Sequence, residues 1–299
     1  IELKRKRGLS LRRQSEQEPL SRHTSFRIGG AADYYYEPET AEELKSLLAR
    51  CKAEGIPSAV IGNGSNLLVG DKGFRGAVIR LGEGFGAIEV NGNRLKAEAG
   101  ALLAKLARTA ADAGLSGLAF AAGIPGTVGG ALVMNAGAYG GEMKDVLESA
   151  ELLMPDGSVR HFTGEELELG YRHSKIPELG AIVLSATFVL TPGEKEEILA
   201  EMKRYAESRR EKQPLNYPSA GSAFKRPPGD TAARLLDEAG CKGLRIGGAA
   251  ISEKHAGFLV NLEHASAADV RAVLTAAAER VEARFGVRLE PEIRFLGEF

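Results

Sequence analysis

Two kinds of apolar spacing alternate along the first two hundred residues of the chain. Leu44 and Leu47 recur at the spacing of one helix face. Thr40 precedes them, with Glu43 three residues later in a capping-box pattern, and Gly55 ends the predicted helix. The same reasoning predicts a strand at 56–61, a helix over 101–115, a central strand at 181–190, and hairpins over 86–100 and 149–162 that turn at Asn91-Gly92 and Asp156-Gly157.

The pattern changes after Glu194, where we expect a longer helix with one charged face. Pro214 ends that helix, and the Pro-, Gly- and Ser-rich stretch 213–230 is typical of a boundary between domains. Beyond it we expect a helix from about Thr231 to Ala239 and another from Ser266, whose apolar face carries Val270, Val273, Leu274, Ala277, Val281 and Phe285. The chain thus divides into a larger α+β region at 21–205 and a smaller α+β domain at 206–299.

The composition of the 299 residues is that of an ordinary globular protein, with 43% hydrophobic and 26% charged residues. A formal net charge of −1 indicates no general affinity for nucleic acid or acidic membranes. The exception is the stretch 4–13, which holds six Lys or Arg. We interpret residues 1–20 as a solvated basic tail, and binding of nucleic acid or anionic lipid is the alternative.

Membrane, export and metal signals are missing from the sequence pattern. No apolar stretch reaches the ~20 residues of a membrane span, and no signal-peptide core follows the basic arm. Cys51 and Cys241 lie far apart, and the five histidines form no metal motif, so we expect no metal site. The two cysteines are typical of reduced thiols in a cytoplasmic protein, with a disulfide as the alternative.

Two glycine-rich stretches carry the first chemical signal. Residues 62–66 have the sequence GNGSN, and residues 123–142 hold seven glycines among apolar residues. No residue between Ala113 and Gly141 is charged at neutral pH. Glycine lets a ligand approach the main chain, and successive backbone N–H groups can then hold a diphosphate without Lys or Arg. The stretches match neither the P-loop nor the dinucleotide-binding fingerprint, and tight turns with close packing remain the other interpretation.

Several motifs in order resemble those of the bacterial UDP-N-acetylenolpyruvoylglucosamine reductases. They are TSFRIGGAADYY at 24–35, IGNGSNLLV at 61–69, AGIPGTVGGALVMNAGAYGGE at 122–142, YRHS at 171–174, SAGSAFKRP at 219–227 and LEPEIRF at 289–295. The resemblance implies an α+β, two-subdomain FAD-binding fold of the vanillyl-alcohol oxidase type. Its subdomains would lie at about 21–80 and 81–205, followed by a substrate-binding domain.

The resemblance also implies FAD bound between the subdomains, with its pyrophosphate against the glycine loops. Some relatives in the larger group attach FAD covalently through His or Cys, but neither residue lies in or beside the loops here, so we expect non-covalent FAD. The residues expected to hold it are Gly62, Asn63, Gly64, Ser65, Asn66, Gly123, Ile124, Pro125, Gly126, Thr127, Gly130, Asn135 and Gly137.

The implied reaction reduces the enolpyruvyl ether of UDP-N-acetylglucosamine enolpyruvate to UDP-N-acetylmuramate, in peptidoglycan precursor synthesis. NADPH gives hydride to the flavin, reduced flavin gives hydride to the vinyl carbon, and the neighbouring carbon receives a proton. Negative charge spreads into the pyruvyl carboxylate, which requires a cation and an acid. Arg172 matches the residue that holds this carboxylate and Ser222 the proton donor. Glu292 matches the glutamate that polarises the enolate, for which we expect a raised pKa.

Matches in the smaller domain imply contacts with the UDP group of the substrate. Only about forty residues separate Arg172 from Lys212, too few for the tyrosine-bearing insertion of one branch of the family, so the chain resembles the shorter subtype. Arg226 stands where that branch has asparagine. The positions implied are Lys212, Arg226, Lys242 and His255, each of which alone would be interpreted as a solvated surface residue.

Two other functions stay open from the residues themselves. A flavin oxidase of the same fold would act on a sugar or alcohol with oxygen, but Arg172, Ser222 and Glu292 together suit enolate protonation. A non-catalytic nucleotide-binding module, RNA-associated through the basic arm, is disfavoured by the near-zero net charge. Flavin colour would exclude the binding module, and oxygen consumption would separate the oxidase from the reductase.

Overall fold

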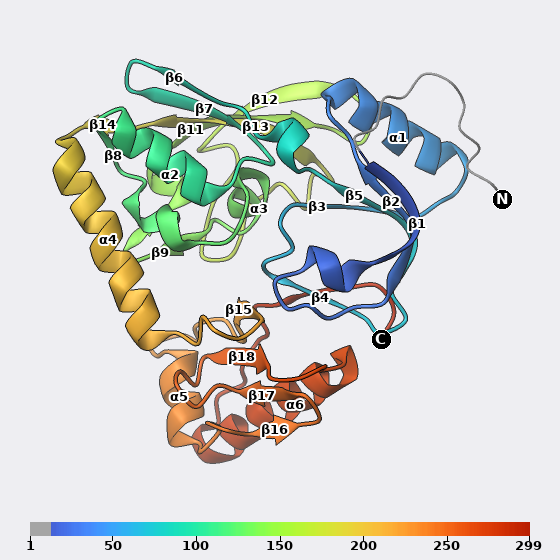
Figure 1. The fold of residues 1–299 in the computed structure, drawn as a ribbon, viewed down its shortest axis with the longest axis vertical. Coiled ribbons are helices and arrows are strands. Elements are labelled where there is room, and N and C mark those ends of the chain that lie inside the picture. The colour runs from blue at the N-terminus through green and yellow to red at the C-terminus, as the bar shows by residue number, and fades with distance from the viewer. Residues whose placement is uncertain (1–12) are drawn as a thin grey trace.

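The computed structural model describes residues 13–299, which form two subdomains side by side and a third, smaller domain below them (Figure 1). The basic arm at 4–13 lies outside the described residues except for Arg13. Residues 13–19, within the predicted tail, form a strand of the first subdomain. Within residues 13–299 we find no helix with the length and hydropathy of a membrane span.

The first subdomain is a four-stranded sheet with one long helix. Its strand order is β1-β2-β5-β3, with β1 antiparallel to β2 and the other neighbours parallel. The side chain of Thr40 accepts a hydrogen bond from the backbone N–H of Glu43, which confirms the predicted start of the helix. The elements are β1 (Arg13–Pro19), η1 (Leu20–His23), β2 (Ala31–Glu37), α1 (Ala41–Ala53), β3 (Ser58–Ile61) and β5 (Phe74–Arg80).

The second subdomain is a five-stranded antiparallel sheet of order β12-β11-β13-β7-β6. The strand predicted at 181–190 is its central strand β13, as expected. Its main elements are β6 (Ile88–Asn91), β7 (Arg94–Glu98), α2 (Leu103–Asp112), α3 (Val128–Val133), β11 (Leu147–Leu153), β12 (Val159–Thr163) and β13 (Ile182–Val189). Shorter pieces are η2 (Glu83–Phe85), β8 (Leu115–Ser116), η3 (Ala119–Gly123), β9 (Gly137–Ala138), β10 (Gly141–Glu142), η4 (Met143–Asp145) and β14 (Thr191–Pro192).

The hairpin of β6 and β7 forms where it was predicted, but its turn is shifted. Asn91 pairs with Arg94, so the two turn residues are Gly92 and Asn93, and the predicted turn at Asn91-Gly92 is wrong by one residue. Gly92 has a φ of +60° and so occupies the first turn position, where a left-handed backbone is needed. The shift changes which residues turn but leaves the strands as predicted.

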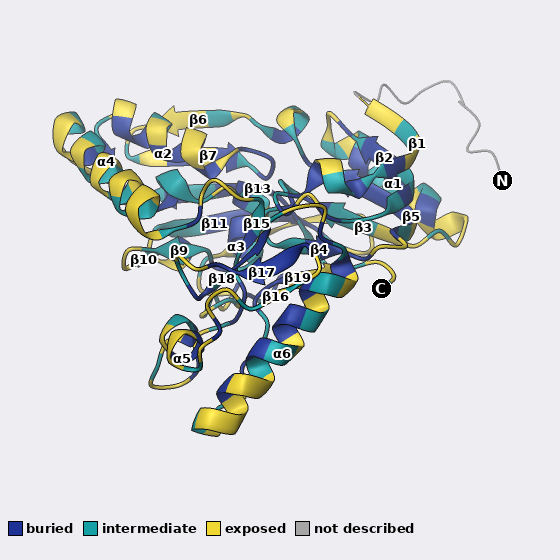
Figure 2. Ribbon diagram, turned by 60° about the horizontal axis from the view of Figure 1, so that its bottom comes forward, coloured by how far each residue is buried: buried dark blue, intermediate teal, exposed yellow. Residues whose placement is uncertain are grey.

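The third domain packs two helices with a four-stranded antiparallel sheet of order β15-β18-β17-β16. Both predicted helices form, and the side chains of Thr231 and Ser266 cap their first turns. The elements are β15 (Ser219–Ser222), α5 (Ala232–Glu238), β16 (Arg245–Ile246), β17 (Ala249–Ile251), β18 (Phe258–Asn261) and α6 (Ala267–Phe285). Figure 2 shows the exposed face of α6 turned to solvent and its buried face turned inward.

Two connections tie the third domain to the rest. Helix α4 (Lys195–Lys212) leads into it, so the division predicted at residue 206 falls inside this helix. After α6 the chain returns, and β19 (Arg294–Leu296) pairs in parallel with β4 (Leu67–Val69), directly after the first glycine loop. Phe26 and Leu68 of the first subdomain also join the hydrophobic core of the third domain. The first subdomain and the third domain therefore share a core and a small sheet.

The two cysteines lie in different cores. Cys51 is buried with the core shared by the two larger subdomains, and Cys241 with the core of the third domain. Both thiols are free. Burial raises the pKa of each thiol, so neither is activated as a nucleophile.

Candidate functional site

A cavity of about 870 Å³ lies where the three domains meet. That volume is in the upper part of the range for cofactor and small-molecule pockets, roughly 300–1,000 Å³. Its lining comes from the loop after β3, the stretch around α3, the end of α4, strand β15 and the segment before β19. Both glycine-rich stretches and all three candidate catalytic residues therefore face one space.

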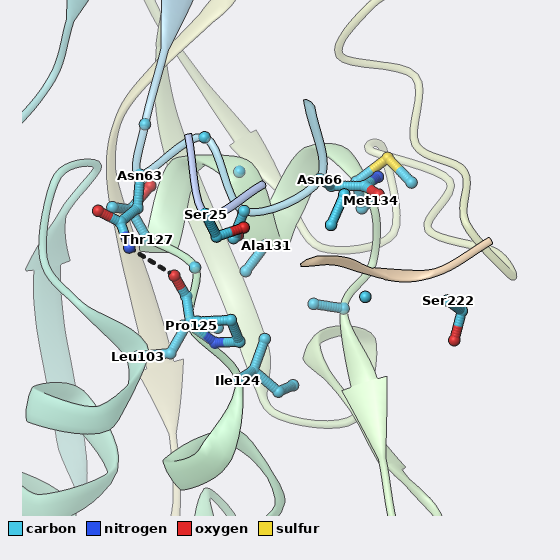
Figure 3. Close-up of a pocket in the computed structure, with 18 of the residues that line it drawn as sticks. Ser25, Asn63, Asn66, Leu103, Ile124, Pro125, Thr127, Ala131, Met134 and Ser222 are labelled. Carbon is cyan, nitrogen blue, oxygen red and sulfur yellow. Dashed lines mark hydrogen bonds between the residues drawn. The ribbon is translucent and has the colours of Figure 1, made fainter. Parts of the chain in front are cut away.

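One side of the cavity is made by uncharged loops, residues 62–66 and 124–130, which we call the neutral wall. The side-chain amide of Asn63 donates to the carbonyl of Pro125 at 2.7 Å and joins the two loops (Figure 3). The hydroxyl of Thr127 is buried and has no hydrogen-bond partner among residues 13–299. A buried hydroxyl without a partner costs free energy, which a bound ligand can recover.

The glycines of the neutral wall are needed for two different reasons. A Cβ at Gly62 would lie 2.2 Å from the Thr127 hydroxyl, and one at Gly64 would lie 2.1 Å from the carbonyl oxygen of His23. These two glycines serve close packing, which was the alternative interpretation of the sequence. Gly126 and Gly130 differ, because their Cβ atoms would come no closer than 3.6 and 3.8 Å to other protein atoms. At these two positions the protein itself leaves room for a Cβ atom, so close packing does not explain the glycines.

Most of the predicted cofactor residues line the cavity, but Gly123 and Asn135 do not. Gly123 packs against the guanidinium of Arg209, 2.5 Å from where its Cβ would lie. Asn135 is 1% exposed, and the oxygen of its side-chain amide accepts from the backbone N–H of Lys144 at 3.0 Å. It donates to Glu142 at 2.5 Å and to the carbonyl of Gly170 at 3.0 Å. The predicted residues that do line the cavity are Gly62, Asn63, Gly64, Ser65, Asn66, Ile124, Pro125, Gly126, Thr127, Gly130 and Gly137.

The anchoring of Gly170 by Asn135 bears directly on Arg172. The short loop around Arg172 is closed by a β-bridge between Gly170 and His173, and Arg172 itself has a left-handed backbone with a φ of +54°. Such strain in a residue with a long side chain persists only when the surroundings enforce it, and it gathers at functional sites. The side-chain amide of Asn135 thus supports the loop that carries Arg172 and does not line the cavity.

Arg172 and Glu292 form the polar centre of the cavity. The Nε–H of Arg172 donates to Oε1 of Glu292 at 2.6 Å, and their side chains are 19% and 11% exposed. Burial raises the pKa of Glu292 above its ordinary value, and the neighbouring charge of Arg172 opposes this only in part. The raised pKa expected for Glu292 is therefore found.

The backbone holds Ser222 next to Glu292. Ser222 lies at the end of β15 beyond an irregularity in its pairing with β18, and such bulges redirect a side chain. The next residue, Ala223, accepts a hydrogen bond from the N–H of Glu292 at 2.9 Å. On the other side, Asn66 of the neutral wall donates its amide to the Glu292 carbonyl at 3.2 Å. The proton donor candidate, the carboxyl candidate and the first glycine loop are thus fixed to one another.

Three of the four residues predicted as substrate contacts also face the cavity. Lys212, Arg226 and His255 all line the cavity, as predicted for substrate contacts. The hydroxyl of Tyr171 accepts from the backbone N–H of Arg226 at 2.9 Å. Burial lowers the pKa of His255, whose Nδ1 accepts from the N–H of Gly257, so this histidine is a neutral hydrogen-bonding group.

Lys242 is the one predicted substrate contact that does not line the cavity. Its ammonium group pairs with Asp237 at 2.6 Å on the exposed surface beside α5. The motif match placed it near the substrate, but the fold of the third domain turns it to solvent.

Several lining residues were not predicted from the sequence, above all Arg209 and Arg294. Arg209 donates to Gln213 at 3.0 Å, and burial lowers the pKa of its guanidinium. No carboxylate pairs with Arg209 or Arg294 among the described residues. Arg209 lies three residues before Lys212, on the same helix face, and this spacing could have revealed it. We call Arg172, Arg209, Lys212, Arg226, Glu292 and Arg294 the charged wall.

Known proteins resemble the chain over nearly its whole length. Residues 32–163 match the model of an FAD binding domain, and residues 213–296 match the C-terminal domain of UDP-N-acetylenolpyruvoylglucosamine reductase. The UDP-N-acetylenolpyruvoylglucosamine reductase of Agathobacter rectalis is 53% identical over 95% of this chain and 94% of its own length. The chain belongs to the UDP-N-acetylenolpyruvoylglucosamine reductase family.

Other members of the reductase family agree with this. The reductase of Alkaliphilus oremlandii is 50% identical over 94% of this chain and 92% of its own length. The crystal structure of the reductase from Thermus caldophilus matches with a TM-score of 0.81 and 43% identity, covering 95% of this chain and 98% of that one. These matches confirm the expected fold, a two-subdomain FAD-binding region followed by a smaller domain. By these matches the chain is an FAD-containing oxidoreductase.

The neutral wall fits FAD on its own geometry. It offers backbone N–H groups, the unpartnered Thr127 hydroxyl and two glycines whose faces toward the cavity are bare. Amide dipoles of this kind hold a diphosphate without a charged side chain. Among residues 13–299 no group of three His, Cys, Asp or Glu side chains is placed to hold a metal ion.

Proposed function

We propose that the chain reduces UDP-N-acetylglucosamine enolpyruvate to UDP-N-acetylmuramate with NADPH. The observation that carries the proposal is the pair of Arg172 and Glu292 at 2.6 Å, fixed by the backbone beside Ser222 and facing the glycine loops. Bound FAD supplies the redox chemistry, which is acceptance of hydride from NADPH and its delivery to the enolpyruvyl carbon. The protein must then hold a carboxylate, stabilise an enolate and deliver a proton.

Arg172 holds the pyruvyl carboxylate in this proposal. Its Nε is taken by Glu292, and neither Nη makes a hydrogen bond to another described residue. The two Nη groups can therefore donate to one carboxylate, the paired geometry in which a guanidinium binds best. As charge moves into the carboxylate, the interaction strengthens, so it stabilises the transition state more than the ground state.

Glu292 acts as a neutral acid beside the enolate. Burial favours the protonated form, and Oε1 accepts from Arg172, so Oε2 is left to carry the proton. A protonated carboxyl donates a hydrogen bond to developing negative charge without adding charge of its own. The arginine and the glutamate thus act on the same enolate from one direction.

Ser222 delivers the proton to the carbon. Its hydroxyl faces the cavity and makes no hydrogen bond to another described residue, so it is free to reach the substrate. A hydroxyl is a weak acid, and it serves here because an enolate is a strong base. Figure 3 shows Ser222 on a different segment from the neutral wall, which leaves space between the two.

The UDP diphosphate meets the positive residues at the edge of the charged wall. Lys212 and Arg209 lie on one face of α4, and Arg226 and His255 come from the third domain. We divide the chain accordingly into an FAD-binding region that ends with α4 and a substrate-binding domain that begins at residue 213. Because NADPH and nucleotide sugars are cytoplasmic metabolites and both thiols are free, we also place the enzyme in the cytoplasm.

The test is an anaerobic experiment on the flavin. The FAD-loaded enzyme is reduced with one equivalent of NADPH, UDP-N-acetylglucosamine enolpyruvate is added, and the visible flavin absorbance is followed. Rapid return of the yellow colour is the expected result. If the flavin stays bleached until air is admitted, the protein is an oxidase of the same fold. If no flavin binds even on reconstitution, the assignment of the neutral wall is wrong.

A further inference from the structure

A second cavity of about 430 Å³ lies beside the large one. It lies between the segment around η1, the end of strand β5 and the linker 215–218 that leads from α4 to β15. Four residues line both cavities: Ser25, Asn63, Leu215 and Tyr217. The two cavities therefore adjoin at these four residues.

The lining of the second cavity is strongly basic. It includes Arg22, Arg27 and Arg80, with no Asp or Glu. Arg22 and Arg27 make no side-chain hydrogen bond or ion pair with another residue of the described chain, 13–299. His23 also lines it, but burial lowers the pKa of this imidazole, and its two nitrogens face Glu18 and Tyr35. The histidine is thus neutral, and the arginines set the charge.

Arg80 connects the second cavity to the cofactor loops. One Nη lies 3.6 Å from Glu37, and the other donates to the side-chain oxygen of Asn63 at 3.3 Å. The Nε of Arg80 is buried without a partner in the described residues. Asn63 in turn donates to Pro125 of the neutral wall. A charge placed beside Arg80 is therefore one side chain away from the residues expected to hold FAD.

The backbone directs Arg27 into this cavity. Its neighbours Phe26 and Ile28 are 0% and 2% exposed in the core shared with the third domain. Arg27 itself has a left-handed backbone, with a φ of +56°, and its N–H donates to the carbonyl of Thr24 at 3.2 Å. An arginine has no intrinsic reason to adopt this conformation, and strain of this kind marks ligand-holding segments.

We propose that the second cavity binds a phosphate monoester, the 2′-phosphate of NADPH, and that Arg22 and Arg27 thereby select NADPH over NADH. This inference rests on the proposed function. A phosphate monoester carries nearly two negative charges at pH 7 and three acceptor oxygens, which suit two guanidinium groups. The neutral wall needs no arginine for the FAD diphosphate, and the substrate diphosphate has the charged wall. NADPH and NADH share a diphosphate, and the 2′-phosphate is the one group that distinguishes them, so two arginines without a protein partner are suited to selecting between the two.

The experiment compares NADPH and NADH on the FAD-loaded holoenzyme. The variants are Arg22→Gln, Arg27→Gln and the double variant, with Arg160→Gln on the exposed edge strand β12 as a matched control. Removing each charge-assisted hydrogen bond should lower kcat/KM for NADPH by about 10- to 100-fold through KM. The value for NADH should change less than about twofold. Arg22→Gln leaves the strained position intact, so the test holds even if Arg27→Gln fails to fold.

A second arm separates the two sources of a phosphate group. Adenosine 2′,5′-bisphosphate should compete with NADPH in the wild type and lose affinity in the double variant. If that compound or inorganic phosphate changes the rate without competing, the cavity is a site for a free anionic effector, and the assignment to NADPH is overturned. An unchanged NADPH-to-NADH ratio overturns it as well. The proposed function is tested independently of this proposal, because reoxidation of the reduced flavin by the UDP substrate needs no NADPH.

Discussion

The two walls of the large cavity recognise ligands by different means. The neutral wall is built from two stretches of main chain whose side chains carry no charge, and Asn63 ties them together. The charged wall takes one or two side chains from each of several segments between Arg172 and Arg294. Backbone dipoles stay in place at any pH, whereas the charged wall includes a carboxyl group that titrates, Glu292, and side chains carried by the third domain. The neutral wall is suited to holding a bound cofactor, and the charged wall is suited to binding the substrate and stabilising its reaction.

This contrast predicts the largest effect for Ser222, the one group that must release a proton. Ser222→Ala should slow reoxidation of the reduced flavin by the UDP substrate by about 10²–10⁴-fold, the usual worth of a general acid. Reduction by NADPH should stay near normal. Stopped-flow absorbance measures the two halves separately, with Ser158→Ala in the distant β11–β12 hairpin as a control. Equal slowing of both halves would mean that Ser222 supports structure or FAD binding instead.

Replacing Glu292 by glutamine tests whether the charged wall works through a protonated carboxyl group. Glutamine keeps a neutral hydrogen-bond donor but cannot ionise, so this substitution should slow the same half-reaction less than Glu292→Ala. For Glu292→Ala we expect slowing by about 10²–10³-fold, the cost of losing one donor to a developing oxyanion. In the wild type, reoxidation of the flavin by the UDP substrate should become slower as pH rises through the raised pKa of Glu292, because the protonated form is lost. The glutamine variant should lack that pH dependence. A wild-type rate that rises with pH would show that the carboxylate works in its ionised form.

The same pKa shift also affects stability. The folded-state pKa of Glu292 lies above its ordinary value of 4.5, so the folded protein binds more protons than the unfolded chain between these two pKa values. The free energy of unfolding should therefore fall as pH rises through this window. Denaturant unfolding at several pH values measures this contribution as a difference: the wild type should lose stability relative to Glu292→Gln as pH rises through the window.

A substitution on the neutral wall should weaken FAD binding and leave the catalytic residues unchanged. Gly126→Ala adds a methyl group toward the cavity, where the nearest protein atom lies 3.6 Å away. We expect the Kd for FAD to rise by about ten- to a hundredfold, equivalent to the roughly 1–3 kcal/mol that overpacking costs. Fluorescence titration of the apoprotein measures this, and its Tm should not change. A lower Tm with unchanged FAD affinity would mean that Gly126 serves packing.

The smallest expected effects test the edge of the charged wall. Lys212→Gln should raise KM for the UDP substrate by about tenfold, the value of one charge-assisted hydrogen bond. Lys242→Gln should change it by less than about twofold, because Lys242 pairs with Asp237 outside the cavity. Steady-state kinetics on both variants would decide, and equal effects would contradict the placement of the two lysines.

What the sequence could predict follows the same division. The glycine loops and the main helices are local patterns, so the strand 181–190, the caps at Thr40 and Ser266 and the neutral wall were accessible from spacing alone. The turn at Gly92-Asn93 was missed by one residue because Asn and Gly are acceptable at either position of such a turn. Local rules fix the elements but not always their register.

The charged wall could not be derived in this way. Arg172, Ser222 and Glu292 come together only through long-range contacts, such as that between Glu292 and Ala223, and a resemblance to known proteins was needed to select them. Asn135 was expected at the cofactor because it lies in a glycine stretch, yet its amide faces Glu142 and Gly170. The side of the backbone on which a residue points depends on packing with distant segments, which spacing does not encode.

The pairing of β19 with β4 has a consequence for how the protein is made. Leu67–Val69 leaves the ribosome more than two hundred residues before Arg294–Leu296, and Glu292 and Arg294 are synthesised after every other residue of the two walls. Both glycine loops and most of the two larger subdomains are therefore synthesised while the nascent chain still lacks Glu292, and the contacts of Asn66 and β4 with the C-terminal segment form afterwards. Cofactor loading can precede catalytic competence during synthesis, because the segment that carries Glu292 and β19 is made after both glycine loops.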